Sequence, residues 1–176
     1  MKRVRSILIG MMAMAIPMMA MGTWDSVSSE RGSAAGVLSD NYQYTLAILF
    51  YPQRECMPIM TVTATAEGMA DEEMNIVPTP LVIDVDGEIW MSTKIARDVH
   101  DGVLWYSIID LPPKALTSLA VGKSARVYVG KIDDAFNLDG SKDAIFQAID
   151  KCLAMTPEEP QQKVPTFHTP RKYTVL

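Results

Sequence analysis

Two cysteines, Cys56 and Cys152, offer the most specific side-chain chemistry in this chain of 176 residues. Redox-active cysteine pairs usually stand close together, as in a C-x-x-C motif, and this pair does not. In an oxidising compartment, a chain with an even number of cysteines, here two, typically forms structural disulfides. Such a bridge would close a loop of about 97 residues and stabilise the fold by roughly 4–5 kcal/mol in the chain-entropy model. We therefore predict a structural Cys56–Cys152 disulfide, with two free thiols or a redox couple as the alternatives.

Side chains suited to catalysis are few. His100 and His168 are the only histidines, and neither a G-x-S-x-G elbow nor an H-E-x-x-H motif accompanies them. Two histidines do not make a three-histidine zinc site. We expect His100, in the stretch RDVHDG, to be a solvated turn residue. The sequence therefore predicts no catalytic residue, no cofactor and no metal site.

Two acidic glycine turns invite a calcium-binding interpretation, which their registers do not support. An EF-hand loop aligned on Gly87 would have Val82 as its first ligand. A loop aligned on Gly140 would have Ala135 and Phe146 at its first and twelfth positions. We predict ordinary turns at both places.

Two further interpretations stay open. A carboxylate pair for glycoside hydrolysis would be far apart in the sequence and would show no motif, so a hydrolase is the alternative function. Trp90, Trp105 and Tyr106 could form an aromatic platform for a carbohydrate. Core packing is the simpler expectation, because Trp105 and Tyr106 point to opposite faces of one strand.

Residues 1–22 have the three-part layout of a secretory signal peptide. A basic start precedes an uncharged run over residues 7–19, and small residues Ala20 and Gly22 stand at the expected cleavage site. The run is shorter than the roughly 20 apolar residues that a membrane span needs. We predict a periplasmic or secreted protein without stable membrane insertion, whose single β-rich domain covers residues 23–155.

The charge balance excludes one class of partner. Three of the 16 basic residues lie in the predicted signal peptide, which leaves 13 against 21 acidic residues and a net charge near −8. An acidic domain binds phosphate backbones poorly, so nucleic acid is not an expected partner.

Hydrophobic alternation and turn residues predict the strands. Residues 25–41 are rich in Ser, Gly and Ala and predict a loose lead-in, with Trp24 packed on the domain edge. Residues 68–80 predict an acidic loop. The predicted strands are 43–51, 59–66, 103–109 and 125–129, together with a hairpin of 81–85 and 88–93 around Asp86-Gly87.

Two helices complete the expected fold. A short one begins at Pro112-Pro113, buries Ala115, Leu116 and Leu119, and ends at Gly122. A longer one, capped by Ser141, carries the apolar stripe Ala144, Ile145, Ala148, Ile149, Cys152 and Leu153. The fold class is therefore mainly β: an antiparallel immunoglobulin-like β-sandwich with a short helix and a C-terminal helix.

A candidate partner surface follows from the strand over residues 59–66. Thr61, Thr63 and Thr65 point away from the apolar row on its other face, so we expect them on an exposed sheet surface. The Pro-rich tail, residues 156–176, is expected to be extended or mobile, and it offers Phe167 and Tyr173. Such a tail can bind a partner by strand addition, or lie along its own domain.

Residues 81–152 resemble the invasion-associated locus B family of exported bacterial envelope proteins. The segments that carry the resemblance are LVIDVDGEIW (81–90), LPPKALTSLAVGKSARVYV (111–129) and AFNLDGSKDAIFQAIDKC (135–152). The resemblance implies an exported immunoglobulin-like sandwich without known catalysis. That family often has a closely spaced cysteine pair where this chain has His100-Asp101. We expect a non-enzymatic domain that acts by protein binding in the bacterial envelope, with an envelope hydrolase as the alternative.

Overall fold

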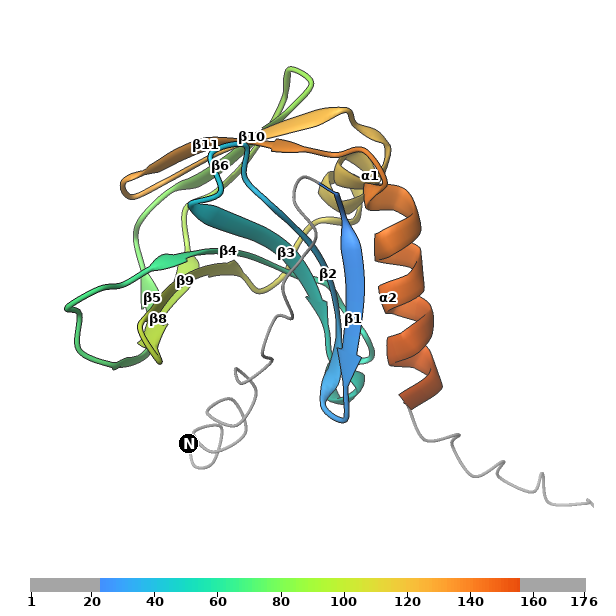
Figure 1. The fold of residues 1–176 in the computed structure, drawn as a ribbon, viewed down its shortest axis with the longest axis horizontal. Helices are drawn as coiled ribbons and strands as arrows, with labels where there is room; N and C mark the ends of the chain where they lie inside the picture. Colours follow the sequence, from blue (N-terminus) through green and yellow to red (C-terminus); the bar gives the residue numbers. More distant parts are fainter. Residues whose placement is uncertain (1–22, 156–176) are drawn as a thin grey trace, which may run out of the picture.

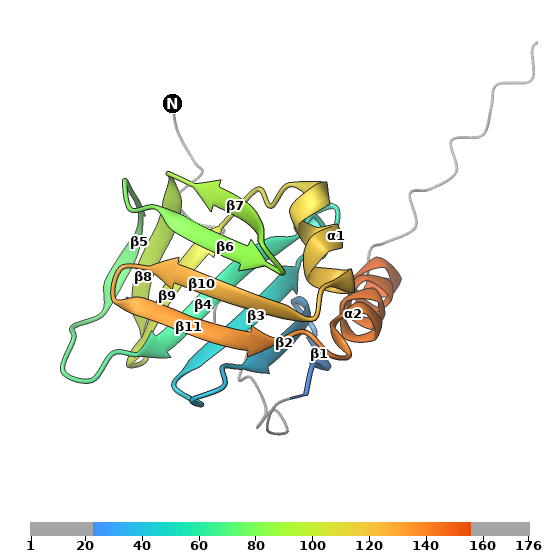
Figure 2. The same ribbon diagram turned by 90° about the horizontal axis from the view of Figure 1, so that it is seen from above.

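The computed structural model describes residues 23–155, which fold into two antiparallel sheets and two helices (Figures 1 and 2). The larger sheet has the strand order β1 (Asp25–Ser29), β2 (Gly32–Leu38), β3 (Tyr44–Phe50), β4 (Ile59–Thr65), β9 (Val103–Ile108), β8 (Ile95–His100), β5 (Glu72–Val77). The smaller sheet has the order β11 (Ile132–Asn137), β10 (Ser124–Val129), β6 (Leu81–Val85), β7 (Glu88–Ser92). The remaining elements are the 3-10 turn η1 (Pro52–Arg54), α1 (Pro113–Val121) and α2 (Ser141–Met155).

The predicted class, a mainly β antiparallel sandwich with a short helix and a C-terminal helix, is confirmed. It shares with immunoglobulin-like domains the packing of two antiparallel sheets. Figure 1 shows the larger sheet bent into an arch, with the smaller sheet and α2 both on its convex side. No helix among residues 23–155 is both long and apolar enough to cross a membrane.

The main core lies between the convex side of the arch and the elements that cover it. Period-two alternation explains why these strands form, because it gives each one an apolar face toward that core. In β10 the odd positions Ala125, Val127 and Val129 are buried and the even ones are exposed, as predicted. The largest fully buried side chains of this core include Phe50, Phe136, Leu46, Ile48, Met60 and Leu81.

The helix α2 packs against β1 and β2, and its burial follows most of the predicted stripe. Ala144, Ile145, Ala148 and Cys152 are buried and Ile149 is partly buried, whereas Leu153 is 54 % exposed. Ser141, predicted as the cap of this helix, is its first residue, and its buried hydroxyl instead donates to the Leu119 carbonyl of α1 at 2.8 Å.

The loose lead-in predicted for residues 25–41 is wrong, because these residues form the β1–β2 hairpin. Their small side chains are not a loop signal here; they let α2 lie close to the sheet. Ser33 is fully buried, and its hydroxyl donates to the Ala148 carbonyl of α2. Trp24 is buried beside them, and its indole N–H donates to the Asn137 carbonyl at 2.9 Å.

The acidic loop predicted for residues 68–80 is also wrong in part. Residues 72–77 form β5, which pairs with β8 through a register irregularity between Glu72 and Asn75. The strand β8, which was not predicted from the sequence, lies between β5 and β9 at this edge of the arch. An acidic edge strand lacks the apolar alternation on which strand prediction depends, because little of it is buried.

The hairpin predicted around Asp86-Gly87 is confirmed. Both turn residues have positive φ, 51° and 91°, which a two-residue turn with the twist of a β-hairpin requires. The Asp86 carboxylate accepts hydrogen bonds from the main-chain N–H groups of Lys123 and Ser124, at 2.7 and 3.1 Å. These bonds lower the pKa of Asp86 and give this side chain the ordinary turn role that the sequence predicts.

Candidate functional site

The disulfide joins the turn after β3 to the last helix, as predicted. Cys56 and Cys152 have an S–S distance of 2.04 Å and a Cα–Cα distance of 6.0 Å, and both are buried. Glu55 and Cys56 have φ values of 55°, the left-handed region, and this turns the chain sharply so that the thiol points toward α2. The pair is structural, because it is enclosed in the core at the helix–sheet contact.

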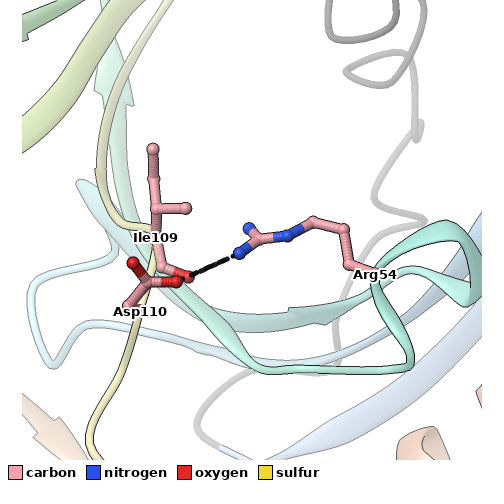
Figure 3. Close-up of polar contacts among 3 residues, drawn as sticks. All are labelled: Arg54, Ile109 and Asp110. Carbon is pink, nitrogen blue, oxygen red and sulfur yellow. Dashed lines mark hydrogen bonds and ion pairs between the residues drawn. The ribbon is translucent and has the colours of Figure 1, made fainter.

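Arg54 lies beside this disulfide and fixes the same turn to another part of the chain (Figure 3). Its guanidinium donates to the Ile109 carbonyl at 3.4 Å and pairs with the Asp110 carboxylate at 3.2 Å. The Asp110 side chain is 81 % exposed, so this ion pair adds little stability. The contact holds the turn after β3 against the β9–α1 connection.

The threonine row lies on the concave side of the arch, and two of its three members are buried. Thr61 is fully buried and Thr63 is 6 % exposed; only Thr65 is exposed. The predicted exposed surface is therefore wrong for Thr61 and Thr63. The Thr61 hydroxyl donates to the Tyr106 carbonyl and accepts from the Ser107 hydroxyl, so its polar capacity is used within the sheet.

The cross-strand partner of Thr63 is Trp105 of β9, whose own partner on β8 is Asp98. Asp98 is 5 % exposed and makes no hydrogen bond or ion pair within residues 23–155. Desolvation raises the pKa of Asp98 to about 6, although nearby His100 and Arg97 act in the opposite direction. A buried carboxylate without a partner is costly to ionise, which makes Asp98 the most unusual titratable group that the structure describes.

His100 follows on the same face of β8, two residues beyond Asp98. Its side chain is exposed, and its Nε2 lies 3.2 Å from a carboxylate oxygen of Asp101 in the turn to β9. Asp71, from the β4–β5 loop, comes to the same place: one donor atom from each of Asp71, His100 and Asp101 lies within 4.8 Å of the others. The sequence did not reveal this acidic corner, because Asp71 is distant in the chain and only the β5–β8 pairing brings it close.

Within residues 23–155 the His100 imidazole has no polar contact besides Asp101. A histidine acting as a base in nucleophilic catalysis needs a hydroxyl or thiol within hydrogen-bonding reach. The imidazole of His100 is solvated, as expected, although the residue ends β8 and the turn begins at Asp101.

The smaller sheet ends on one side in β11, which also contacts β2 and β3 of the larger sheet, and on the other side in β7 (Figure 2). Ile89 and Met91 are 68 % and 65 % exposed on its outer face. The register places Met91 beside Val82, and Val82 beside Tyr128, which is 36 % exposed. An apolar row therefore crosses three strands and ends at an edge that no described strand covers.

The three aromatic residues considered as a carbohydrate platform do not share a surface. Tyr106 and Trp90 pack against the main core, whereas Trp105 is buried on the concave side of the arch. The indole N–H of Trp90 is buried at the β7 edge and has no acceptor among residues 23–155. This unsatisfied donor is a second unusual feature of that edge.

These features define a helix-stapled, two-sheet antiparallel sandwich with one apolar free edge and one acidic corner. Comparisons with protein-family models, with curated proteins and with solved structures give no match for this chain. Phe167 and Tyr173, proposed from the sequence as part of the partner surface, and the predicted signal peptide lie outside the described residues.

Proposed function

We propose that this chain is an exported, non-enzymatic domain of the bacterial envelope, and that it binds another protein by strand addition at β7. The observation that carries the proposal is the pair of exposed apolar side chains, Ile89 and Met91, on a strand that ends its sheet. Monomeric proteins usually protect such edges with charge, proline or a covering element. An unprotected apolar edge is therefore a candidate interaction site.

The hairpin geometry defines what β7 offers to a partner. In a two-residue hairpin the closing pair, here Val85 and Glu88, exchanges main-chain hydrogen bonds, and every second pair does the same. The N–H and C=O groups of Trp90 therefore face β6, while those of Ile89 and Met91 face the free edge. A partner strand would pair with these two residues and lay its outward side chains against the apolar row.

The inward face of β7 favours a partner strand with a polar side chain. Trp90 points toward the core, and its buried N–H has no acceptor within the described part of the chain. An added strand with an oxygen-bearing side chain at the facing inward position could accept this hydrogen bond. Because a buried unsatisfied donor costs roughly 1–3 kcal/mol, the gain would favour polar residues such as Ser, Thr or Asn there.

The proposed export and envelope location are supported by the disulfide and by the sequence, not by β7. The Cys56–Cys152 bridge is typical of an oxidising compartment. The tripartite segment over residues 1–22 supports secretion, and the resemblance to the invasion-associated locus B family supports an envelope role. Nothing in the solvated contacts of His100 favours the alternative hydrolase.

Site-specific photo-crosslinking in the producing cell tests the proposal. A photoreactive residue at Met91 should give one discrete adduct, whereas the same residue at Phe146, exposed on α2, should give none. The partner identified by mass spectrometry should then bind the purified domain directly. Equal adducts at both positions, or none at Met91, would reject β7 as the interface.

A proline substitution separates main-chain pairing from apolar contact. Met91→Pro removes an N–H that faces the free edge and leaves the bonds to β6 in place, so the domain should still fold. We expect Met91→Pro to abolish partner binding and the control Met91→Ala to weaken it only in part. Full binding by a folded Met91→Pro variant would show that strand addition is not the mode of recognition.

A further inference from the structure

We propose that Asp71, His100 and Asp101 form a binding site for a divalent transition-metal ion, with zinc as the natural probe. This site is independent of the proposed β7 interface, because it lies at the far edge of the other sheet (Figure 1). Each residue offers one ligand atom, and these atoms lie within 4.8 Å of one another. The donor set is one imidazole nitrogen and two carboxylate oxygens.

That donor set matches the coordination chemistry of zinc. Zinc accepts histidine nitrogen and aspartate oxygen at about 2.0–2.2 Å, which in a tetrahedral site places ligand atoms roughly 3.4 Å apart. His100 Nε2 and the Asp101 carboxylate already lie 3.2 Å apart. Asp71 has to approach by a small side-chain rotation, and its exposed position leaves it free to do so. Water would fill the fourth position, since all three ligands are exposed.

The backbone holds the two contributing segments together. The N–H of Ala66, at the start of the β4–β5 loop, donates to the Gly102 carbonyl in the β8–β9 turn at 2.8 Å. Asp101 has a φ of 50°, so it occupies a defined turn position rather than the end of a flexible loop. Asp71 directly precedes β5, which is paired to β8. The ligands are therefore carried by anchored segments, which lowers the entropic cost of binding.

A second observation points to a cation here. As a residue Asp98 is only 5 % exposed, its carboxylate has no hydrogen-bonding partner among residues 23–155, and it lies on the same face of β8 as His100. The guanidinium of the adjacent Arg97 pairs with Glu72, on the other face of β8. A metal ion on His100 would supply the missing positive charge beside Asp98. Asp98 would act in this way as an electrostatic partner and not as a ligand.

Isothermal titration of the EDTA-treated, dialysed protein with zinc tests the site. We expect saturable binding of one zinc ion per chain. His100→Ala, Asp101→Asn and Asp71→Asn should each weaken it by about tenfold or more, because each removes one of only three protein ligands. All three residues are exposed, so the variants should fold, and circular dichroism with thermal melting verifies this.

Two control variants keep the assignment specific. His168→Ala removes the other histidine, and Asp139→Asn removes an exposed carboxylate from a different turn. Neither should change zinc affinity. The indole fluorescence of Trp105, next to Asp98, should respond to zinc in the control variants and not in His100→Ala. Unchanged affinity in His100→Ala, loss of binding in His168→Ala, or no saturable binding at all would each overturn the proposal.

Discussion

Cys56 and Cys152 are joined over a Cα–Cα distance of 6.0 Å and connect the turn after β3 to the final helix. Cys152 is fully buried, and Cys56 is 8 % exposed. The bridge therefore lies within the contact between α2 and the larger sheet. The small residues of β2 let α2 lie close to the larger sheet. The disulfide adds a covalent link to this packing.

Removing the bridge should destabilise the domain strongly. For the variant with Cys56→Ala and Cys152→Ala we expect a loss of about 2–5 kcal/mol in the free energy of unfolding, measured by urea denaturation. A reducing agent should lower the melting temperature of the wild type toward that of the variant and leave the variant unchanged. A wild-type melting temperature that does not respond to reduction would contradict the structural role of the bridge.

Gly122 allows α1 and the smaller sheet to approach closely. A Cβ atom placed there would lie 2.5 Å from Val85 Cγ1 and 2.9 Å from the Ser118 carbonyl oxygen. Gly122→Ala should therefore cost about 1–3 kcal/mol in unfolding free energy through overpacking. The neighbouring Val121→Ala, at a side chain 67 % exposed, should change it by less than about 0.5 kcal/mol. Equal effects of the two substitutions would show that the contact relaxes without cost.

The sequence predicted those elements whose burial leaves a clear period. β4, β10 and the β6–β7 hairpin alternate cleanly, and β3 and β9 are short apolar runs bounded by turn residues. The helices have apolar stripes, and α1 ends at Gly122, so all of these elements were found. β1 and β2 were missed because they contain small residues such as Ser33 and Ala35, which fit a close approach of α2 but have low strand propensity. β5 was missed because an exposed acidic edge strand has no apolar face.

The candidate sites were less predictable than the fold. Alternation correctly placed Thr61 and Thr63 opposite the main core, but it gave no information on the curvature of the sheet or on their partners Ser107 and Trp105. The acidic corner depends on the β5–β8 pairing, which no local pattern encodes. The edge position of β7 depends in the same way on the order of strands in the sheet.

Trp24 sets a limit on how the amino terminus can be processed. Its buried indole donates to the Asn137 carbonyl, so a mature protein that begins after Trp24 would lose this contact. We expect the intact mass of the exported protein to show loss of residues 1–22, give or take two, and the Trp24 contact restricts the latest cleavage to the bond after residue 23. Full-length protein in the cytoplasm would contradict the predicted export.

Trp24→Ala should lower the unfolding free energy by about 3–5 kcal/mol, as for other large buried aromatic residues.

The burial of Asp98 makes stability depend on pH in a defined direction. Its pKa is raised in the folded state from 3.8 to about 6, so the folded protein holds a proton that the unfolded chain releases. The stabilisation from this neutral carboxyl is complete below about pH 4 and is lost as the pH rises through 6.

Asp98→Asn should therefore match the wild type near pH 4 and exceed it above pH 7, by about 2–3 kcal/mol at most in unfolding free energy. Urea denaturation of both proteins at each pH, with EDTA present to remove any bound cation, isolates this difference. Asp139→Asn, at an exposed turn, serves as the control and should show no such pH-dependent gain in unfolding free energy. If the wild type were instead the more stable protein above pH 7, the Asp98 carboxylate would have a stabilising partner, and its description as a buried, unpaired charge would be wrong.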